Sequence, residues 1–418
     1  MFSFRIGYLL PFFLFLSVNG KGQDSLYTRK IINTLTSKEY HGRGYVKNGD
    51  RLAALRIREE FNRLKLLPEG NHYFQQFSFP VNTFPAAMSL ITDHHQLIPG
   101  VDFIISPESN SLKGTFPVKV VNQPPSFYKD ENLSNTIVLV DTTGHTDTFD
   151  AGALKNWTSS SSPAKGVIWI SEKKLTWSVS IKQPSIFSAQ VLRSSISTPP
   201  KAISVDVKSD FVMSHTTQNI IGKIEGVLYP DSFIYITAHY DHLGMMGDKT
   251  FFPGANDNAS GVSMLLNLAN YFSLPEHRPK YSIVFICFAG EEAGLLGSKY
   301  YTEHPTHPLS SIRFLLNLDL LGTGDEGMMV VNATVFNKEF SLLDSINSSH
   351  HYLPSIGKRG KAHNSDHYYF TEQNVPSFFC YTLGGITAYH DIYDKETTLP
   401  LTRYQETFRL LSTFIEAL

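Results

Sequence analysis

The chain has 418 residues, a formal net charge of −2 and 42% hydrophobic residues. This length suits two domains, or one domain with a large insertion, and the hydrophobic fraction predicts a folded core rather than bulk disorder. The near-neutral charge excludes the basic footprint of a nucleic-acid-binding protein, and no long charge run predicts a membrane-surface patch.

The N-terminus has the features of a signal peptide. Arg5 supplies a positive charge before an apolar run from Ile6 to Val18, and the small residue Gly20 offers a cleavage site. The run is short for a membrane span, although an uncleaved anchor stays open as the alternative. We therefore expect residues 1–20 to be removed and the mature chain to be exported to the periplasm, the cell surface or the medium, with no stable membrane span.

The first part of the mature chain, residues 25–65, reads as helical. Ile57, Phe61 and Leu64 recur there at i, i+4 and i+7, which is the spacing of one helix face. An amphipathic lead-in of this kind is expected to pack against the main body of a domain.

Residues 73–210 have a different character. Short β-rich runs such as Thr136–Val140 and Gly166–Ile170 alternate there with clusters of Pro, Ser, Thr and Asn. All three tryptophans lie in this part, at positions 157, 169 and 177. We expect a β-rich inserted domain over residues 81–211, which acts as a lid over a site in the rest of the chain.

From about residue 219 apolar runs of strand length alternate with stretches of helix length. The runs are Phe233–Ala238, Tyr281–Phe288, Phe314–Leu318 and Val375–Tyr381, and the helical stretches are Val262–Phe272, Leu295–Tyr301, Phe340–Ile346 and Arg403–Leu418. Buried strands alternating with helices predict an α/β fold with a mostly parallel central sheet flanked by helices. We assign residues 21–80 and 212–418 to this domain.

The two cysteines, Cys287 and Cys380, both lie inside apolar runs. We interpret them as buried thiols, because free cysteine is among the most buried residue types. A disulfide between them is the alternative in an oxidising compartment. Neither has a closely spaced partner, so cysteine ligation of a metal is not expected.

Acidic residues and histidines follow the predicted strands of the second half. They are His239, Asp241, Asp257, Glu291, Glu292, Asp319 and His390. Ligands of open α/β sheets bind at the carboxyl ends of the strands, so we expect these side chains to converge there. Each residue alone has an ordinary interpretation, such as a helix cap, an Asx turn or a solvated charge. Their joint placement favours a metal site with nitrogen and oxygen ligands.

The number of candidate ligands predicts two metal ions. One catalytic zinc takes about three protein ligands and keeps a position for water, so five candidates exceed one site, and two ions fit if Asp257 bridges them. The five are His239, Asp257, Glu292, Asp319 and His390. Asp241 lies two residues after His239 and can support its other ring nitrogen, whereas Glu291 can act on a water as general base.

At these positions the chain resembles the co-catalytic zinc aminopeptidase family, which contains the bacterial leucyl aminopeptidases. The matching segments are His41–Arg43, Asn219–Gly226, Ala238–His242, Gly254–Gly261, Glu291–Ser298, Asn317–Asp319, Ser365–His367 and Tyr389-His390. The resemblance covers most of the mature chain outside residues 81–211. It implies a zinc-dependent exopeptidase, and first of all an aminopeptidase that hydrolyses N-terminal residues of peptides.

The resemblance also implies individual roles. One zinc would be bound by His239, Asp257 and Glu292, and the other by Asp257, Asp319 and His390. Glu291 would be the general base and then the acid for the leaving amine, and Asp241 would support the ligands.

Two parts of the resemblance are weaker. On Asn135–Asp141 and Lys165–Ile170 the insert resembles a protease-associated domain, with a family-specific β decoration as the alternative. Some relatives place an oxyanion-stabilising tyrosine before the Ser-Asp-His segment, where His363 is the candidate substitute. Asp366 and Tyr389 complete the candidate substrate-binding residues, although Asp366 can equally begin a helix.

Two other functions share this fold. Glutaminyl cyclases use a single zinc and tend to carry tryptophan directly before the last histidine, where this chain has Tyr389. Noncatalytic receptor ectodomains typically lose metal ligands, whereas this chain retains all five and the base. The segment Gly294–Ser298 also favours the peptidase.

Overall fold

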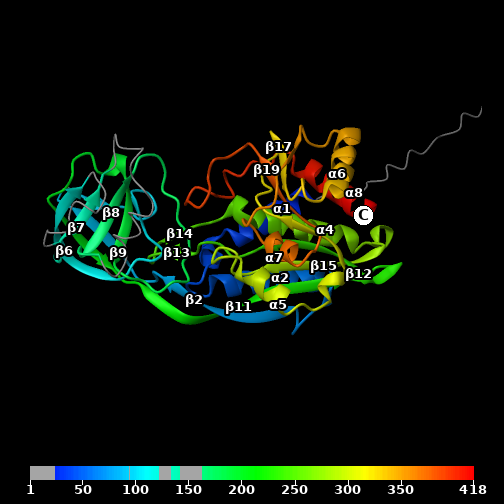
Figure 1. Ribbon diagram of the computed structural model, residues 1–418, viewed down its shortest axis with the longest axis horizontal. Coiled ribbons are helices and arrows are strands. Elements are labelled where there is room, and N and C mark those ends of the chain that lie inside the picture. Colours follow the sequence, from blue (N-terminus) through cyan, green and yellow to red (C-terminus); the bar gives the residue numbers. More distant parts are fainter. Residues whose placement is uncertain (1–23, 94, 122–132, 142–161) are drawn as a thin grey trace, which may run out of the picture.

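The computed structural model describes residues 24–93, 95–121, 133–141 and 162–418, which form two large sheets lying side by side (Figure 1). The predicted signal peptide and Trp157 lie outside the described residues. Within the described ranges, no helix has the length and apolar character needed to cross a membrane.

The larger sheet has a parallel centre and antiparallel flanks. β15 (Tyr281–Phe288), β12 (Tyr229–His239), β16 (Ile312–Leu318) and β19 (Ser377–Leu383) are parallel neighbours in that order. On one side β11 (Asp210–Ile224) pairs antiparallel with β15 and with β1 (Leu67–Pro68) and β2 (Phe74–Thr83). On the other side β17 (Gly327–Val331) pairs antiparallel with β19 and parallel with β18 (Ile356–Lys358). The predicted central sheet is thus confirmed.

Helices cover both faces of this sheet. They are α1 (Ser25–Leu35), α2 (Gly49–Arg63), α4 (Gly261–Phe272), α5 (Leu296–Glu303), α6 (Asn337–His350), α7 (His367–Glu372) and α8 (Tyr404–Ala417). Alternate residues of β12 face opposite cores: Ile234 and Ile236 pack with α1, α2, α4, α6 and α8, whereas Tyr235 packs with Tyr301 of α5 and Phe370 of α7. Burial on both faces explains why the central strands are continuous apolar runs.

The second sheet consists of strands from the predicted insert. Its order is β4 (Gln96–Leu97), β3 (Ser89–Thr92), β10 (Ala202–Val207), β6 (Leu112–Val121), β7 (Ile137–Val140), β8 (Gly166–Ser171), β9 (Phe187–Leu192) and β5 (Phe103–Ile105). All eight strands fall inside residues 81–211, so the β-rich character is confirmed. The domain boundaries and the likeness to a protease-associated domain stay predictions.

The insert packs directly on the segment that follows His239. β2 and β11 of the larger sheet form a long antiparallel pair that runs toward the second sheet (Figure 1). The hydrophobic core of the second sheet includes Leu243, Met246 and Phe252, which belong to the other part of the chain. The segment that follows His239 therefore packs into the core of the second sheet.

Both cysteines are free and fully buried, Cys287 in β15 and Cys380 in β19. The interpretation as buried thiols is confirmed, and the alternative of a disulfide between them is wrong. Burial in the apolar sheet raises the pKa of both thiols, so neither is a ready nucleophile.

Candidate metal centre

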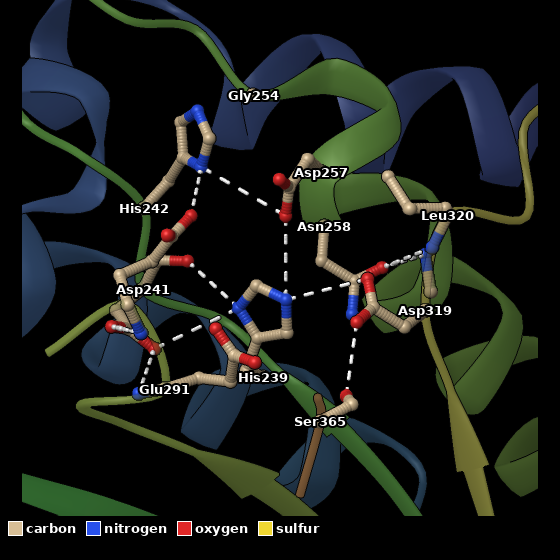
Figure 2. Close-up of polar contacts among 12 residues, drawn as sticks. His239, Asp241, His242, Gly254, Asp257, Asn258, Glu291, Asp319, Leu320 and Ser365 are labelled. Carbon is tan, nitrogen blue, oxygen red and sulfur yellow. Dashed lines mark hydrogen bonds and ion pairs between the residues drawn. The ribbon is translucent and has the colours of Figure 1, made fainter. Parts of the chain in front are cut away.

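The predicted metal ligands lie at one edge of the central sheet. β12 ends at His239, Asp319 follows the last residue of β16, and Glu291 and Glu292 stand in the turn after β15. Because these three strands are parallel neighbours, their carboxyl ends meet. Asp257 joins them from a π-helical turn, Ala255–Ser260, that precedes α4. Figure 2 shows His239 at the centre of this cluster.

The two carboxylate oxygens of Asp257 face two different histidines. Its Oδ1 lies 3.3 Å from Nε2 of His239, and its Oδ2 lies 3.2 Å from Nε2 of His390. Each histidine also faces a second acid: Nε2 of His239 lies 3.4 Å from Oδ1 of Asp319. Nε2 of His390 lies 3.2 Å from Oε2 of Glu292. Asp257 is thus the carboxylate shared by two ligand sets.

This partition differs from the one that the resemblance implied. We expected His239 with Glu292 and His390 with Asp319, whereas the close contacts pair His239 with Asp319 and His390 with Glu292. The strand order explains the difference, because β12 and β16 are adjacent and bring their ends together. The contacts therefore favour a different assignment of ligands to the two ions, and the same five side chains do converge.

The donor set fits a pair of divalent cations. Three groups of imidazole and carboxylate atoms, each with members within 4.8 Å of one another, overlap at His239, Asp257 and Glu292. Oδ1 of Asp319 is buried and has no hydrogen-bond partner, as expected for an oxygen aimed at a cation. Buried carboxylates packed this closely need positive charge between them. Imidazole nitrogen with carboxylate oxygen is a ligand set that zinc accepts.

Glu291 belongs to one of these groups, with His239 and Glu292, but no ion pair joins its carboxylate to a histidine in the described ranges. Burial raises its pKa well above the usual range, and the neighbouring carboxylates of Glu292, Asp366 and Asp319 raise it further against the opposing effect of His239. A carboxylate held this way readily takes up a proton, which suits a general base.

Asp241 supports both the histidine and the glutamate pair. Its Oδ2 accepts a 2.6 Å hydrogen bond from Tyr45 Oη and a 3.3 Å bond from the Glu292 amide, and its Oδ1 accepts a 3.3 Å bond from the Glu291 amide. Nδ1 of His239 lies 3.2 Å from the Asp241 carbonyl oxygen (Figure 2). The predicted supporting position is therefore occupied, and Asp241 also anchors the turn that presents Glu291 and Glu292.

His242 is a further supporting residue that the sequence does not single out. Its ring is fully buried, and its Nδ1 lies 2.7 Å from Oε1 of Glu292. The two oxygens of Glu292 are thereby divided, one toward His242 and the other toward His390. Its position inside the segment Ala238–His242 is the only signal in the sequence.

Arg43 ties the N-terminal segment to the metal-binding loops. Its guanidinium is fully buried and donates hydrogen bonds to the carbonyl oxygens of Tyr240, Pro253, Gly254 and Asp257. The chain turns between α1 and α2 at Gly42, where a Cβ would lie 2.4 Å from the Gly244 carbonyl oxygen. The segment His41–Arg43 thus lies against the loops that carry His239 and Asp257.

The insert contacts the last ligand directly. Nδ1 of His390 lies 3.0 Å from the Trp177 carbonyl oxygen, and the Trp177 amide donates to the His390 carbonyl oxygen at 2.9 Å. Lys174 forms a 2.8 Å ion pair with Asp391 and donates to the Thr387 carbonyl oxygen at 2.9 Å. The ring of Trp177 stacks on Phe252 with 4.7 Å between centroids. Residues 174–177 therefore hold the loop that carries His390.

A cavity of about 290 Å³ opens beside the cluster. It is lined by His239, Asp257, Glu291, Glu292, Asp319, Leu320, Arg359, Asn364, Phe379, Tyr381, Tyr389 and His390. Tyr389 is 44% exposed and its ring stacks on His390 with centroids 4.0 Å apart. This places one of the three candidate substrate-binding residues at the site.

The other two candidates lie differently. His363 is exposed, stacks on Tyr368 with centroids 3.8 Å apart and does not line the cavity. Asp366 precedes α7 and is fully buried, but its side chain makes no capping hydrogen bond to that helix. Burial raises the pKa of Asp366 to about 7, and it lies close enough to Glu291 to affect the pKa of that group.

Comparison with known proteins agrees with this geometry. Residues 219–415 match Peptidase family M28. Aminopeptidase YwaD of Bacillus subtilis (strain 168) is 42% identical over 117 residues, which cover 27% of this chain and 24% of the relative. A probable zinc metalloprotease of Pyrenophora teres f. teres is 35% identical over 116 residues, again 27% and 24%. The matched segment thus spans about a quarter of these relatives.

Solved structures extend the likeness of the fold over almost the whole chain. The zinc aminopeptidase BSAP of Bacillus subtilis is similar over 93% of this chain and 94% of its own, with a TM-score of 0.69 and 21% identity. An aminopeptidase of Aneurinibacillus sp. strain AM-1 is similar over 94% of both chains, with a TM-score of 0.66 and 19% identity. Residues 219–415 are thus similar to peptidase family M28, and the solved structures show the same fold over almost the whole chain.

Proposed function

We propose that this chain is a zinc-dependent exopeptidase, and first of all an aminopeptidase that removes N-terminal residues from peptides. The observation that carries the proposal is the contact of the two Asp257 oxygens with two histidines, each of which has its own acid. Five ligands arranged around one shared carboxylate suit two ions held side by side.

When bound, the zinc pair supplies a Lewis acid for the scissile carbonyl and lowers the pKa of a water molecule. His239 and Asp319 would hold one ion, His390 and Glu292 the other, and Asp257 both. Glu291 lines the cavity and is not needed as a ligand. We propose that its carboxylate accepts a proton from the attacking water. It then transfers this proton to the leaving amine nitrogen as the peptide C–N bond breaks.

The aminopeptidase is preferred over the other members of this fold for three reasons. The cavity of about 290 Å³ suits one end of a peptide rather than a long extended chain. YwaD and BSAP carry the name aminopeptidase. If the chain were a glutaminyl cyclase with one zinc, the second set of ligands would have no role. If it were a noncatalytic ectodomain, neither set of ligands would have a role.

We also propose that the enzyme is exported after removal of residues 1–20. The apolar run Ile6–Val18 behind Arg5 supports this. N-terminal sequencing of exported material is expected to begin near Lys21. Recovery of a chain that begins at Met1 in the membrane fraction would favour the anchor instead.

The function is tested with the full mature chain, stripped of metal and titrated with zinc. Hydrolysis of peptides with a free amino terminus is expected to rise until two zinc ions are bound per chain, and N-acetylated peptides of the same sequence are expected to be poor substrates. Release of C-terminal residues would identify a carboxypeptidase. Cyclisation of N-terminal glutamine at one zinc per chain would identify the cyclase.

A further inference from the structure

Arg359 lines the same cavity as the candidate metal ligands. It directly follows β18 at the edge of the central sheet, and its side chain is half-buried. Its Nη1 donates a 2.9 Å hydrogen bond to Oη of Tyr381, which lies on β19 and also lines the cavity. The hydroxyl of Tyr381 therefore fixes the direction of the Arg359 guanidinium.

The charge of Arg359 has no acidic partner within the described residues. The neighbouring Lys361 pairs with Glu372, whereas no ion pair joins Arg359 to a carboxylate in those ranges. A guanidinium has five N–H donors in a fixed fork, and the bond to Tyr381 uses one. A half-buried fork with spare donors at a cavity is suited to a planar carboxylate.

The carboxylates that line the cavity do not neutralise the charge of Arg359 when two zinc ions are bound. Asp257, Glu291, Glu292 and Asp319 are the carboxylates among the lining residues. Two divalent cations would balance their four negative charges, which leaves the charge of Arg359 in surplus. The loaded cavity therefore attracts an anionic group at the end marked by Arg359 and Tyr381.

We propose that Arg359, oriented by Tyr381, binds a carboxylate of the substrate. This deepens the proposed function and rests on it. The carboxylate has two possible sources in a small peptide: the side chain of an acidic N-terminal residue, or the C-terminal carboxylate of a dipeptide. Phe379 and Leu320 supply apolar lining for the adjoining carbon atoms.

The test compares substrates that differ in one carboxylate. Glutamyl-alaninamide against glutaminyl-alaninamide isolates the side chain, and alanyl-alanine against alanyl-alaninamide isolates the C-terminus. The zinc-loaded wild type is expected to prefer the acid in one of the two pairs by about 10- to 100-fold in kcat/KM, as for a charge-assisted hydrogen bond. Arg359→Gln is expected to abolish that preference and to change the neutral substrates by less than about threefold.

Two variants control for damage to the fold. Arg359→Lys keeps the charge without the fork and is expected to retain part of the preference. Lys358→Gln removes a positive charge from the preceding, exposed residue of β18 and is expected to retain all of it. Equal losses on neutral and acidic substrates in Arg359→Gln, or a wild type without preference in either pair, overturn the proposal.

Binding separates this proposal from the proposed function. Titration calorimetry of the zinc-loaded protein with glutamate, glutamine, alanine and alaninamide reports carboxylate recognition without turnover. The protein could bind the carboxylate ligands more tightly than the amides, lose this difference in Arg359→Gln, and hydrolyse no peptide. That result would support carboxylate binding and contradict the peptidase. Peptide hydrolysis without discrimination in either assay supports the peptidase and contradicts carboxylate binding.

Discussion

Nδ1 of His390 is held 3.0 Å from the carbonyl oxygen of Trp177, so a backbone group of the insert orients a proposed metal ligand. A carbonyl oxygen accepts only from a protonated nitrogen, so Nδ1 carries a proton and Nε2 is the nitrogen that could bind a cation. The lid stays a prediction, and residues 174–177 are expected to keep these contacts while His390 binds metal. Motion of the rest of the insert stays a prediction.

Zinc is expected to change the intrinsic tryptophan fluorescence of the metal-free protein, because it draws His390 and the bonded Trp177 into one position. Trp177→Phe keeps the backbone bond and is expected to abolish the response, whereas Trp169→Phe, on β8, is expected to preserve it. A response that survives in Trp177→Phe would show that this coupling is absent.

The pairing of ligands is expected to appear in zinc stoichiometry. His239→Ala and Asp319→Ala are each expected to lower bound zinc from two ions to about one per chain. The double variant is expected to keep the same one ion, because both substitutions remove the same zinc. His239→Ala combined with Glu292→Ala is expected to approach zero, as is Asp257→Ala alone. Elemental analysis of dialysed protein decides between this partition and the one that pairs His239 with Glu292.

His242→Ala is expected to weaken binding of the zinc assigned to Glu292 and His390 by about 10- to 100-fold, the usual effect of losing a group that orients a ligand. The reason is the 2.7 Å contact that fixes Oε1 of Glu292 and leaves Oε2 for the metal. Competition with a chelator measures the affinity. His363→Ala, on the exposed surface, is the matched control. Equal affinities in the two variants would contradict the role of His242.

Glu291→Gln is expected to lower kcat by about 10²- to 10⁴-fold while zinc content stays at the wild-type value, because the residue is assigned to proton transfer. Elemental analysis and peptide hydrolysis are measured on the same preparation. Loss of zinc in proportion to activity would identify Glu291 as a ligand and refute the assignment.

His367 is expected to make stability depend on pH. Burial lowers its pKa to about 3, below the value of about 6.5 in the unfolded chain. Between these values only the unfolded chain takes up the proton, so stability is lost as pH falls below about 6.5, by about 2 kcal/mol at pH 5.

The measurement for His367 is urea unfolding of wild type and His367→Gln at pH 7 and pH 5. Loss of zinc on acidification affects both proteins and cancels in the comparison. The wild type is expected to lose about 2 kcal/mol more than the variant between the two pH values. Equal losses would show that His367 does not carry this effect.

The sequence by itself determined the central sheet, the β-rich segment and the convergence of the five metal-ligand candidates. Continuous apolar runs such as Tyr281–Phe288 reflect burial on both faces, and polar residues at the strand ends mark the edge where a site forms. These are local properties of the chain, so the pattern and spacing of residues along the sequence predict them.

Only the tertiary structure decided which candidate ligands contact one another and what supports them. The pairing of His239 with Asp319 depends on the adjacency of β12 and β16, and pattern does not specify the order of strands in a sheet. Trp177 and His390 are 213 residues apart, as are Lys174 and Thr387. Contacts over such separations depend on how the chain closes around its core, which no periodicity along the sequence records.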